Sequence, residues 1–199
     1  MNDAITEVLR ATRSDLMTSQ LEDVALRLFE ERGFADVTVN EIAAAAGISV
    51  RTFYRYFPSK DLLLQVRVER RGAAISAALS VRPGDEPVLT SLRIAIPEAM
   101  ATEDPELVRR WITVLTDAPE LVRGVLGGVV MKIQGPIAEF VADRMQPPGD
   151  AFASTILAGA VSGAVQAGLR HWFVTGGDLP ATIAESLDVL TRLDSALPR

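Results

Sequence analysis

The sequence predicts an all-α protein in which an N-terminal three-helix helix-turn-helix domain is followed by a C-terminal helical bundle. Residues 38–64 carry helix start, turn and stop signals within a few helical turns. Apolar residues recur at spacings of three and four in residues 17–32, 59–79 and 179–197, which is the period of an amphipathic helix. Clusters of glycine and proline, such as residues 81–87, separate the periodic segments. Together these observations favour helices joined by short turns.

The helix-turn-helix begins with a capping box. The Thr38 hydroxyl can accept a hydrogen bond from a backbone N–H, while Glu41, three residues on, reaches back to the Thr38 N–H. Gly47 allows an abrupt turn because glycine tolerates a positive φ. Ser49 is placed to cap the next helix, and Pro58 stops it, since proline disfavours α geometry in the residue before it. The segment therefore predicts two short helices joined by a tight turn.

The second helix of this pair carries side chains suited to nucleic acid. Phe53 and Phe57 lie four residues apart and are expected in the core. The other side combines guanidinium groups, hydroxyls and aromatic rings, which can contact guanine, the thymine methyl group and phosphate oxygens. Lys60, expected just inside the following helix, would add a contact to the DNA backbone. The predicted DNA-binding residues are Thr38, Ser49, Val50, Arg51, Thr52, Tyr54, Arg55, Tyr56 and Lys60.

Charge is distributed unevenly along the chain. The formal net charge of −6 would, taken alone, argue against nucleic acid as a partner. The first 71 residues hold ten basic and eleven acidic residues, however, and the remainder holds ten and fifteen. We therefore expect a positive patch within residues 50–71; the alternative is a helical hairpin whose arginines only confer solubility. The basic residues of this segment are Arg51, Arg55, Lys60, Arg67, Arg70 and Arg71.

Several functional classes are disfavoured by composition. The chain has no cysteine, which excludes disulfides, thiol redox switches and cysteine-based metal sites. Its one histidine, His171, argues against a zinc cluster. No glycine-rich phosphate loop or nucleophile elbow is present, so we expect neither an enzyme nor a cofactor. The absence of a secretory leader at the N-terminus predicts a cytoplasmic protein.

We expect three parts along the chain. Residues 1–16 lack a clear helical period and form a frayed or partly helical arm that either touches DNA or is a solvated tail. Residues 17–64 form the DNA-binding domain, and residues 80–199 form the C-terminal ligand-binding and dimerisation domain. The helix over 59–79 joins these two domains, so its tilt would set where the recognition helix points.

The C-terminal domain contains candidates for a ligand pocket. Helices are expected over 88–101, 104–117 and 120–145, the last interrupted by glycines and by the Gly135-Pro136 pair. Such breaks are typical of a pocket wall, with a plain kink as the alternative. Large or adaptable apolar side chains with a few polar ones among them would line the pocket, unless they form simple core. The candidates are Met100, Trp111, Met131, Gln134, Phe140, His171, Trp172 and Phe173.

The last two helices are predicted to form a dimer interface. The apolar helix over 151–175 is long enough to raise the question of a membrane span, but its polar residues and internal glycines argue for a buried helix of a soluble protein. Its small residues Gly159, Gly163 and Ala167 let another helix approach closely. Together with residues 179–197 this helix suits packing across a subunit interface; an intramolecular core is the alternative.

The helix-turn-helix resembles the DNA-binding segment of the TetR (tetracycline repressor) family of bacterial transcription regulators. The resemblance implies an all-helical homodimer with an N-terminal DNA-reading domain and a C-terminal domain that binds a small molecule and dimerises. Arg55 occupies a position that is often aromatic or histidine in relatives, which concerns only the local contact. The matching residues are Thr38, Ile42, Ala43, Ala46, Gly47, Ser49, Phe53, Tyr54, Tyr56, Phe57, Lys60 and Leu63.

The resemblance implies a repressor that binds a palindromic operator as a homodimer, with recognition helices in successive major grooves about 34–36 Å apart. Residues 104–111 and the His171-Trp172 pair are similar to relatives with acyl-CoA-like or otherwise lipophilic ligands. We hypothesise that such a ligand selects a conformer in which the helix over 59–79 is tilted, which weakens DNA binding. The competing interpretation is a helical small-molecule carrier without sequence-specific DNA binding.

Overall fold

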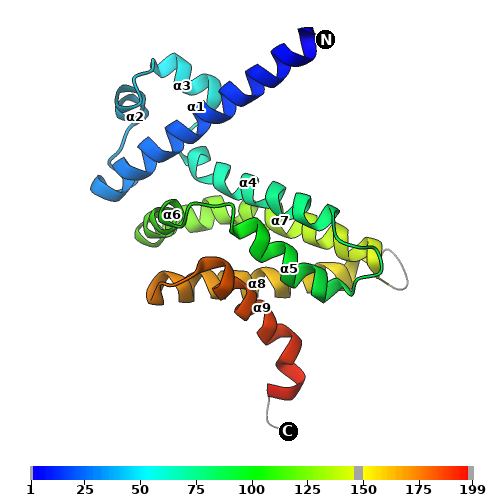
Figure 1. Ribbon diagram of the computed structural model, residues 1–199. Helices are drawn as coiled ribbons and strands as arrows, with labels where there is room; N and C mark the ends of the chain where they lie inside the picture. The colour runs from blue at the N-terminus through cyan, green and yellow to red at the C-terminus, as the bar shows by residue number, and fades with distance from the viewer. Residues whose placement is uncertain (1, 146–149, 197–199) are drawn as a thin grey trace. The chain divides into compact units, whose positions relative to one another are not determined.

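The protein is built from α-helices. The computed structural model describes the backbone of residues 2–145 and 150–196, and their side chains except those of residues 2–13, 15, 119–131 and 193–196. Helices are the only regular elements in this described part, which confirms the all-α prediction (Figure 1). In chain order they are α1 (Asn2–Arg32), α2 (Val39–Ala45), α3 (Val50–Tyr56), α4 (Asp61–Ser80), α5 (Val88–Met100), α6 (Pro105–Asp117), α7 (Pro119–Arg144), α8 (Ala151–Thr175) and α9 (Leu179–Ala196).

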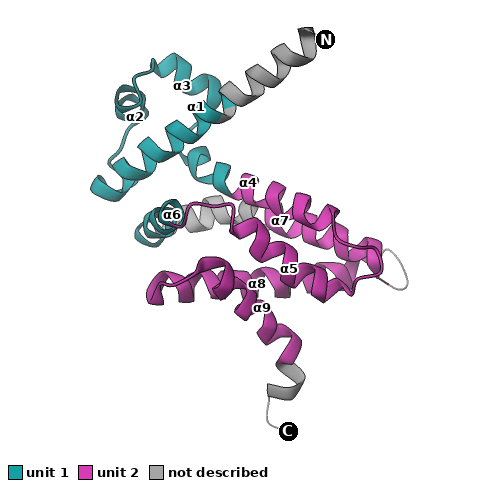
Figure 2. Cartoon of the chain, in the orientation of Figure 1, with its two compact units in different colours: residues 1–67, 106–125 teal, residues 68–105, 126–199 magenta. Residues whose placement is uncertain are grey.

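The chain divides into two compact units (Figure 2). Unit 1 comprises residues 1–67 and 106–125, and unit 2 comprises residues 68–105 and 126–199. Helix α4 is continuous and contributes its first residues to unit 1 and the others to unit 2. In this division α6 groups with unit 1, and the domain limits of 17–64 and 80–199 stay a prediction.

An apolar core holds unit 1 together. Apolar residues at spacings of three and four place one face of α1 against the helix-turn-helix. Helix α6 adds Trp111, whose buried indole N–H donates to the carbonyl oxygen of Leu64 at 3.0 Å. This hydrogen bond satisfies a polar group that burial would otherwise leave without a partner. The buried apolar residues of unit 1 include Leu21, Ala25, Phe29, Ile42, Phe53 and Leu63.

Two helices are more continuous than the sequence indicated. Helix α1 begins at Asn2, so the arm expected over residues 1–16 is helical from residue 2 onward. A nucleated helix adds residues at low cost, which allows the strongly periodic part of α1 to continue into a stretch without a clear pattern. Helix α7 runs through Pro136 without interruption, although breaks were expected within residues 120–145.

The proline of α7 is accommodated at a close contact with α4. Pro136 has no N–H, so the carbonyl of Lys132 lacks its usual donor four residues on. A Cβ at Gly72 of α4 would lie 2.8 Å from that carbonyl oxygen, closer than a side chain can come without a backbone shift. The feature that predicted a broken helix therefore marks a place where two helices of unit 2 pack closely.

Unit 2 is organised around α8 and α9. Helix α9 packs against α8 and α5, and α8 has the predicted bounds of 151–175. At Gly168 the two helices approach so closely that a Cβ would lie 2.8 Å from the Ser186 Oγ and 3.1 Å from the Ile183 Cδ1. Among the described residues, α8 is the one helix that could cross a membrane by length and composition, a test that core helices of soluble proteins also pass.

Candidate nucleic-acid interface

The helix-turn-helix has the local geometry that the sequence predicted. The Thr38 Oγ1 accepts from the backbone N–H of Glu41 at 3.3 Å, and the Glu41 Oε2 accepts from the Thr38 backbone N–H at 2.8 Å. This confirms the capping box. Gly47, at φ 68°, makes the turn, and the Ser49 Oγ accepts from the backbone N–H of Thr52 at 3.0 Å. Helices α2 and α3 therefore begin where their capping residues predict.

Helix α3 presents a polar and aromatic face to solvent. Phe53 and Phe57 are buried, at 0% and 4% exposure, and anchor the helix in unit 1. Among the predicted DNA contacts on and next to this helix, Ser49, Arg51, Tyr54 and Arg55 are exposed, while Val50, Thr52 and Tyr56 are half-buried. A shallow surface hollow is lined by Arg51, Thr52, Tyr54 and Arg55, so these four side chains border one continuous surface.

Short-range contacts arrange the side chains on this face. The Arg55 Nη2 donates to the Tyr56 Oη at 3.3 Å, and the guanidinium carbon lies 5.0 Å from the centroid of the Tyr56 ring. The hydroxyls of Ser49 and Thr52 are 2.8 Å apart, within hydrogen-bond distance. The guanidinium of Arg55 is therefore held near an aromatic ring and still reaches solvent.

Lys60 and Thr38, two predicted DNA contacts, are engaged within unit 1. The Lys60 Nζ donates to the carbonyl oxygens of Phe34 at 2.6 Å, Val37 at 2.8 Å and Ala35 at 3.3 Å. The Thr38 hydroxyl donates to the Glu41 carboxylate at 2.7 Å. Lys60 also precedes α4 instead of lying inside it, because the helix begins at Asp61.

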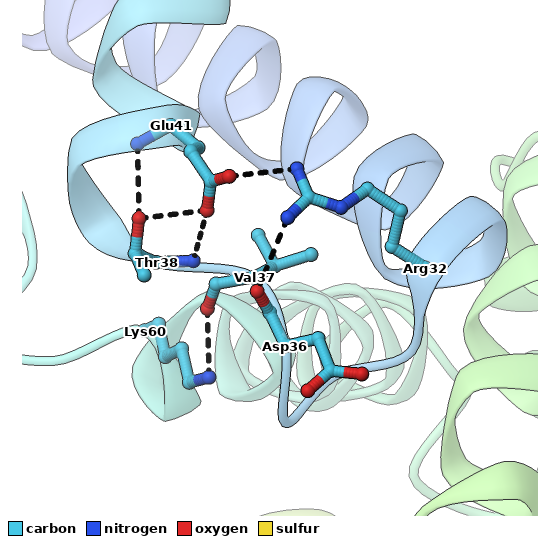
Figure 3. A network of polar contacts seen from close by, with 6 residues as sticks. All are labelled: Arg32, Asp36, Val37, Thr38, Glu41 and Lys60. Carbon is cyan, nitrogen blue, oxygen red and sulfur yellow. Dashed lines mark hydrogen bonds and ion pairs between the residues drawn. The ribbon is translucent and has the colours of Figure 1, made fainter.

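Arg32, a residue that sequence reasoning did not single out, completes this network (Figure 3). Its Nη1 lies 2.8 Å from the Glu41 Oε1, and its Nη2 donates to the Asp36 carbonyl at 3.3 Å. The hydrogen bonds from Thr38, the backbone one foremost, together with Arg32 lower the pKa of Glu41 from 4.5 to about 2. The only sequence signal was a basic residue in the last turn of a helix, a position where arginines are commonly solvated.

Two arginines of the predicted positive patch are buried in ion pairs. The Arg67 Nε lies 3.0 Å from the Glu22 Oε1 in unit 1. In unit 2 the Arg71 guanidinium donates to both carboxylate oxygens of Glu103, at 2.6 and 3.0 Å. Arg67 and Arg71 are only 6% and 3% exposed. The interpretation of residues 50–71 as one positive surface was therefore wrong for these two residues, and the exposed arginines of this segment are Arg51 and Arg55 of α3 and Arg70 of α4.

The candidate ligand residues occur in different surroundings. Trp111 belongs to unit 1, where its indole is bonded to Leu64. The others belong to unit 2, where Met100 is fully buried and the Trp172 indole donates to the Gly177 carbonyl at 3.0 Å. Gln134, Phe140 and Phe173 are half-buried, His171 is exposed beside a groove between α8 and α9, and the side chain of Met131 lies outside the described residues.

The outer face of α8 carries exposed apolar side chains within the single chain, together with the exposed polar residues Gln166 and Arg170. Phe152, Ile156 and Val174 are 78%, 56% and 82% exposed. A Cβ added at Gly159 or Gly163 would meet none of the described atoms within 4 Å, so nothing in the described part of the chain packs against these two glycines. The third of these small residues, Ala167, lines the groove between α8 and α9, and a dimer interface through the last two helices stays a prediction.

Two family models match the chain. Residues 21–66 match the model described as bacterial regulatory proteins, tetR family. Residues 86–194, more than half of the chain, match the model described as the MftR C-terminal domain. The chain belongs to the TetR family of transcriptional regulators. Members of this family bind DNA, dimerise and carry a ligand-binding C-terminal domain, and they are regulators rather than enzymes.

Curated relatives are TetR-like regulators as well. The HTH-type transcriptional regulator MT1294 of Mycobacterium tuberculosis (strain CDC 1551 / Oshkosh) is 34% identical over 113 residues, which are 54% of each chain. MftR of M. tuberculosis H37Rv, named as a mycofactocin biosynthesis transcriptional regulator, is 29% identical over 154 residues, 76% of this chain and 77% of its own. The chain thus spans about half the length of the first of these two relatives.

Solved structures of TetR-family regulators share the fold. A regulator from Syntrophomonas wolfei covers 92% of this chain and 97% of its own, with a TM-score of 0.70 and 15% identity. The TetR-family repressor FadR of Thermus thermophilus, solved in complex with lauroyl-CoA, covers 92% of this chain and 96% of its own, with a TM-score of 0.53 and 22% identity. At these identities the likeness concerns the fold alone.

Proposed function

We propose that this TetR-family protein is a cytoplasmic repressor that binds a palindromic operator as a homodimer and is released by a small lipophilic ligand. The observation that carries the proposal is the outer face of α3, where Arg51, Thr52, Tyr54 and Arg55 border one solvent-exposed surface. A short helix anchored by two buried phenylalanines can enter the major groove with this face toward the base edges.

The residues of α3 divide into base-reading and positioning roles. Arg51 and Arg55 present guanidinium groups that can bind guanine O6 and N7 through two hydrogen bonds. Thr52 supplies a methyl group and a hydroxyl for a base edge, and Tyr54 supplies a hydroxyl for a phosphate oxygen. Tyr56, held beside Arg55, would orient that guanidinium. Ser49 and Val50 lie at the start of the helix, where the backbone can approach the phosphates.

The proposed dimer forms through the outer faces of α8 and α9. Phe152 and Val174 lie eleven residues on either side of Gly163, roughly 16 Å along the helix axis in each direction. Two antiparallel copies of α8 crossing at Gly163 would place each Phe152 beside Val174 of the second copy. Exposed apolar side chains at both ends and small residues at the centre support this register. A stable interface needs about 800 Å² from each partner, so part of α9, including the exposed Val189, would also contribute.

The effector is proposed to act through α4. The lauroyl-CoA complex of the T. thermophilus protein supports a lipophilic ligand for this fold. In this chain the proposed pocket residues that belong to unit 2 remain Met100, Met131, Gln134, Phe140, His171, Trp172 and Phe173. Because α4 is continuous between residues of both units, a ligand that favours one position of its unit 2 segment would change the orientation of the helix-turn-helix. A regulator of this kind acts where the chromosome is, which places it in the cytoplasm.

A selection from random DNA tests the proposal without knowledge of the operator. The purified protein is incubated with a library of duplexes containing a random central segment, and bound duplexes are enriched over several rounds. We expect inverted repeats whose half-sites are separated by about one helical turn or a multiple of it. Enrichment of no sequence at any salt concentration would contradict the proposal and favour a helical small-molecule carrier.

Cysteine cross-linking tests the dimer separately, because the chain has no native cysteine. Gly163→Cys lies on the proposed twofold axis and is expected to give a disulfide-linked dimer on mild oxidation. Gly159→Cys and Ala167→Cys should each give little product alone but should cross-link when mixed, since they lie at equal distances from the axis. If Gly159→Cys alone cross-linked equally rapidly, the twofold axis would not lie at Gly163. A monomeric mass by light scattering would contradict the proposed dimer.

A further inference from the structure

The segment between α1 and α2, residues 33–38, is held by two cations. On one side the Lys60 Nζ lies within hydrogen-bond distance of three carbonyl oxygens, those of Phe34, Ala35 and Val37. On the other side Arg32 donates to the Asp36 carbonyl and pairs with Glu41, the third residue of α2 (Figure 3). The segment therefore has four of its carbonyl oxygens bonded to two side chains.

The ammonium of Lys60 has no donor left for another partner in this arrangement. An ammonium carries three N–H donors and no acceptor, and each of the three carbonyl oxygens lies 2.6–3.3 Å from the Nζ. The Nζ also lies 4.3 Å from the centroid of the Phe34 ring, a cation–π distance. To reach a phosphate, Lys60 would have to break charge-assisted hydrogen bonds to partly buried carbonyls.

The position of this segment determines where the helix-turn-helix begins. Thr38 is the capping residue of α2, and it directly follows Val37, whose carbonyl is bonded to Lys60. Helix α3 is connected to α2 by a turn of four residues, so a shift of Thr38 would move both helices together. A side chain that fixes Val37 thus acts on the recognition helix from a distance.

We infer that Lys60 is a positioning residue for DNA recognition, which holds the connection between α1 and α2 and makes no phosphate contact itself. The inference rests on the proposed DNA-binding function and assigns Lys60 a different role from the phosphate contact that its charge alone predicted. The two roles differ in a measurable way. Each phosphate contact that is lost reduces the slope of log K against log salt by about 0.9. An interface that is displaced but keeps the same number of phosphate contacts keeps its slope.

The test measures binding of Lys60→Met to a 30-base-pair duplex of random sequence by fluorescence anisotropy, in KCl between 50 and 200 mM. We expect the affinity to fall by roughly three- to tenfold at every salt concentration, with an unchanged slope. Arg55→Met serves as the matched loss of one charge from the exposed face of α3. On random sequence its guanidinium has no cognate guanine and is expected to bind a phosphate instead, so the slope of this variant should fall by about 0.9. A slope that falls equally in both variants would overturn the inference.

Two further measurements separate positioning from simple support of the fold. Circular dichroism establishes a temperature at which the Lys60→Met protein is folded; wild-type affinity of the folded variant would overturn a positioning role. If Lys60→Met does not fold, Lys60→Arg is used instead. Its planar guanidinium cannot reproduce the contacts of the ammonium, so we expect weakened binding with an unchanged slope, whereas a phosphate contact would be rescued.

Hydrogen exchange keeps this test distinct from that of the proposed function. Backbone amides of residues 34–41 should exchange faster in Lys60→Met, or in Lys60→Arg, than in the wild type, even without DNA. If the wild type bound no duplex at all, the proposed function would fail. The exchange data would still report whether Lys60 holds residues 33–38 in place. Unchanged exchange in this segment would overturn the inference even if DNA binding were intact.

Discussion

Helices α3 and α4 each carry two arginines four residues apart, and the two pairs have different fates. Arg51 and Arg55 of α3 are exposed and border one surface hollow. Arg67 and Arg71 of α4 are buried and paired with carboxylates. Residue type and spacing are the same in both helices. What differs is whether the helix face that carries the arginines meets solvent or a carboxylate elsewhere in the chain.

This difference separates arginines that can contact DNA from arginines that stabilise the fold. A guanidinium at the surface keeps its donors for base edges and phosphates, which it can bind in a fixed geometry. A buried guanidinium must be paired, because leaving its charge without compensation is costly. The arginines of α3 are thus available for a partner such as DNA. Arg67 and Arg71 of α4 instead tie the two parts of one helix to Glu22 in unit 1 and to Glu103 in unit 2, while the third arginine of α4, Arg70, is exposed.

The largest expected effect comes from breaking a buried pair. Glu22→Met leaves the buried guanidinium of Arg67 without its carboxylate, and we expect the free energy of unfolding to fall by about 3–5 kcal/mol. Urea denaturation followed by circular dichroism measures this change. The double variant with Arg67→Met should recover most of the loss, because the buried guanidinium charge itself is removed. Arg27→Met, which breaks the exposed pair with Asp23, is the matched control and should cost at most about 1 kcal/mol.

A loss below about 1 kcal/mol in Glu22→Met would contradict the comparison, because it would mean that the buried arginine finds equal compensation elsewhere. A double variant as unstable as the single one would point to packing, not charge, as the contribution of this pair. Either result would weaken the distinction between the arginines of α3 and α4.

A smaller effect, in a different quantity, is expected on α3. Arg51→Ala should leave the free energy of unfolding within about 0.5 kcal/mol of the wild type, because the side chain is exposed. Its affinity for a selected duplex should fall by about 1–3 kcal/mol, with a relaxed preference at one base pair. Arg51→Lys keeps the charge without the planar fork and should recover only the sequence-independent part. Equal losses on selected and random duplexes would exclude a base-reading role.

Local features of this fold could be predicted from the sequence, because their partners lie a few residues away. Thr38 and Glu41 form the capping box, Ser49 caps α3, and Gly47 adopts the positive φ of the turn. Each depends on groups within three or four residues, whose chemistry determines the geometry. The predicted bounds of α8 were confirmed for a similar reason, since a capping aspartate and a glycine pair flank it.

The roles of Lys60, Arg67 and Arg71 could not be predicted in the same way. Their partners lie 23–26, 45 and 32 residues away along the chain, so the sequence showed only basic residues near a DNA-binding motif. The continuity of α7 through Pro136 also depends on tertiary packing, because Gly72 of α4 lies against the carbonyl that the proline leaves without a donor. Propensity is a weak prior that such contacts override.

The smallest expected effect is on the pH dependence of stability, where the helix-turn-helix can be compared with unit 2. The pKa of Glu41 is lowered from 4.5 to about 2 by its contacts with Thr38 and Arg32. A carboxylate with a lowered folded-state pKa contributes stability that is fully present above pH 4.5 and is lost as the pH falls through 2. Between these values the thermal midpoint of Glu41→Gln should therefore fall less steeply with decreasing pH than that of the wild type.

Glu86 provides the matched control in unit 2, because hydrogen bonds from Arg82 and Ser91 also lower its pKa to about 2. Glu86→Gln should flatten the acid dependence to a similar degree, but without faster hydrogen exchange at the start of α2. An NMR titration of the Glu41 carboxyl carbon measures the pKa directly. A midpoint near 4.5 would show that the capping box is not held in solution. The contacts of Arg32 with residues 33–38 would then no longer be connected to α2 through the Glu41 carboxylate.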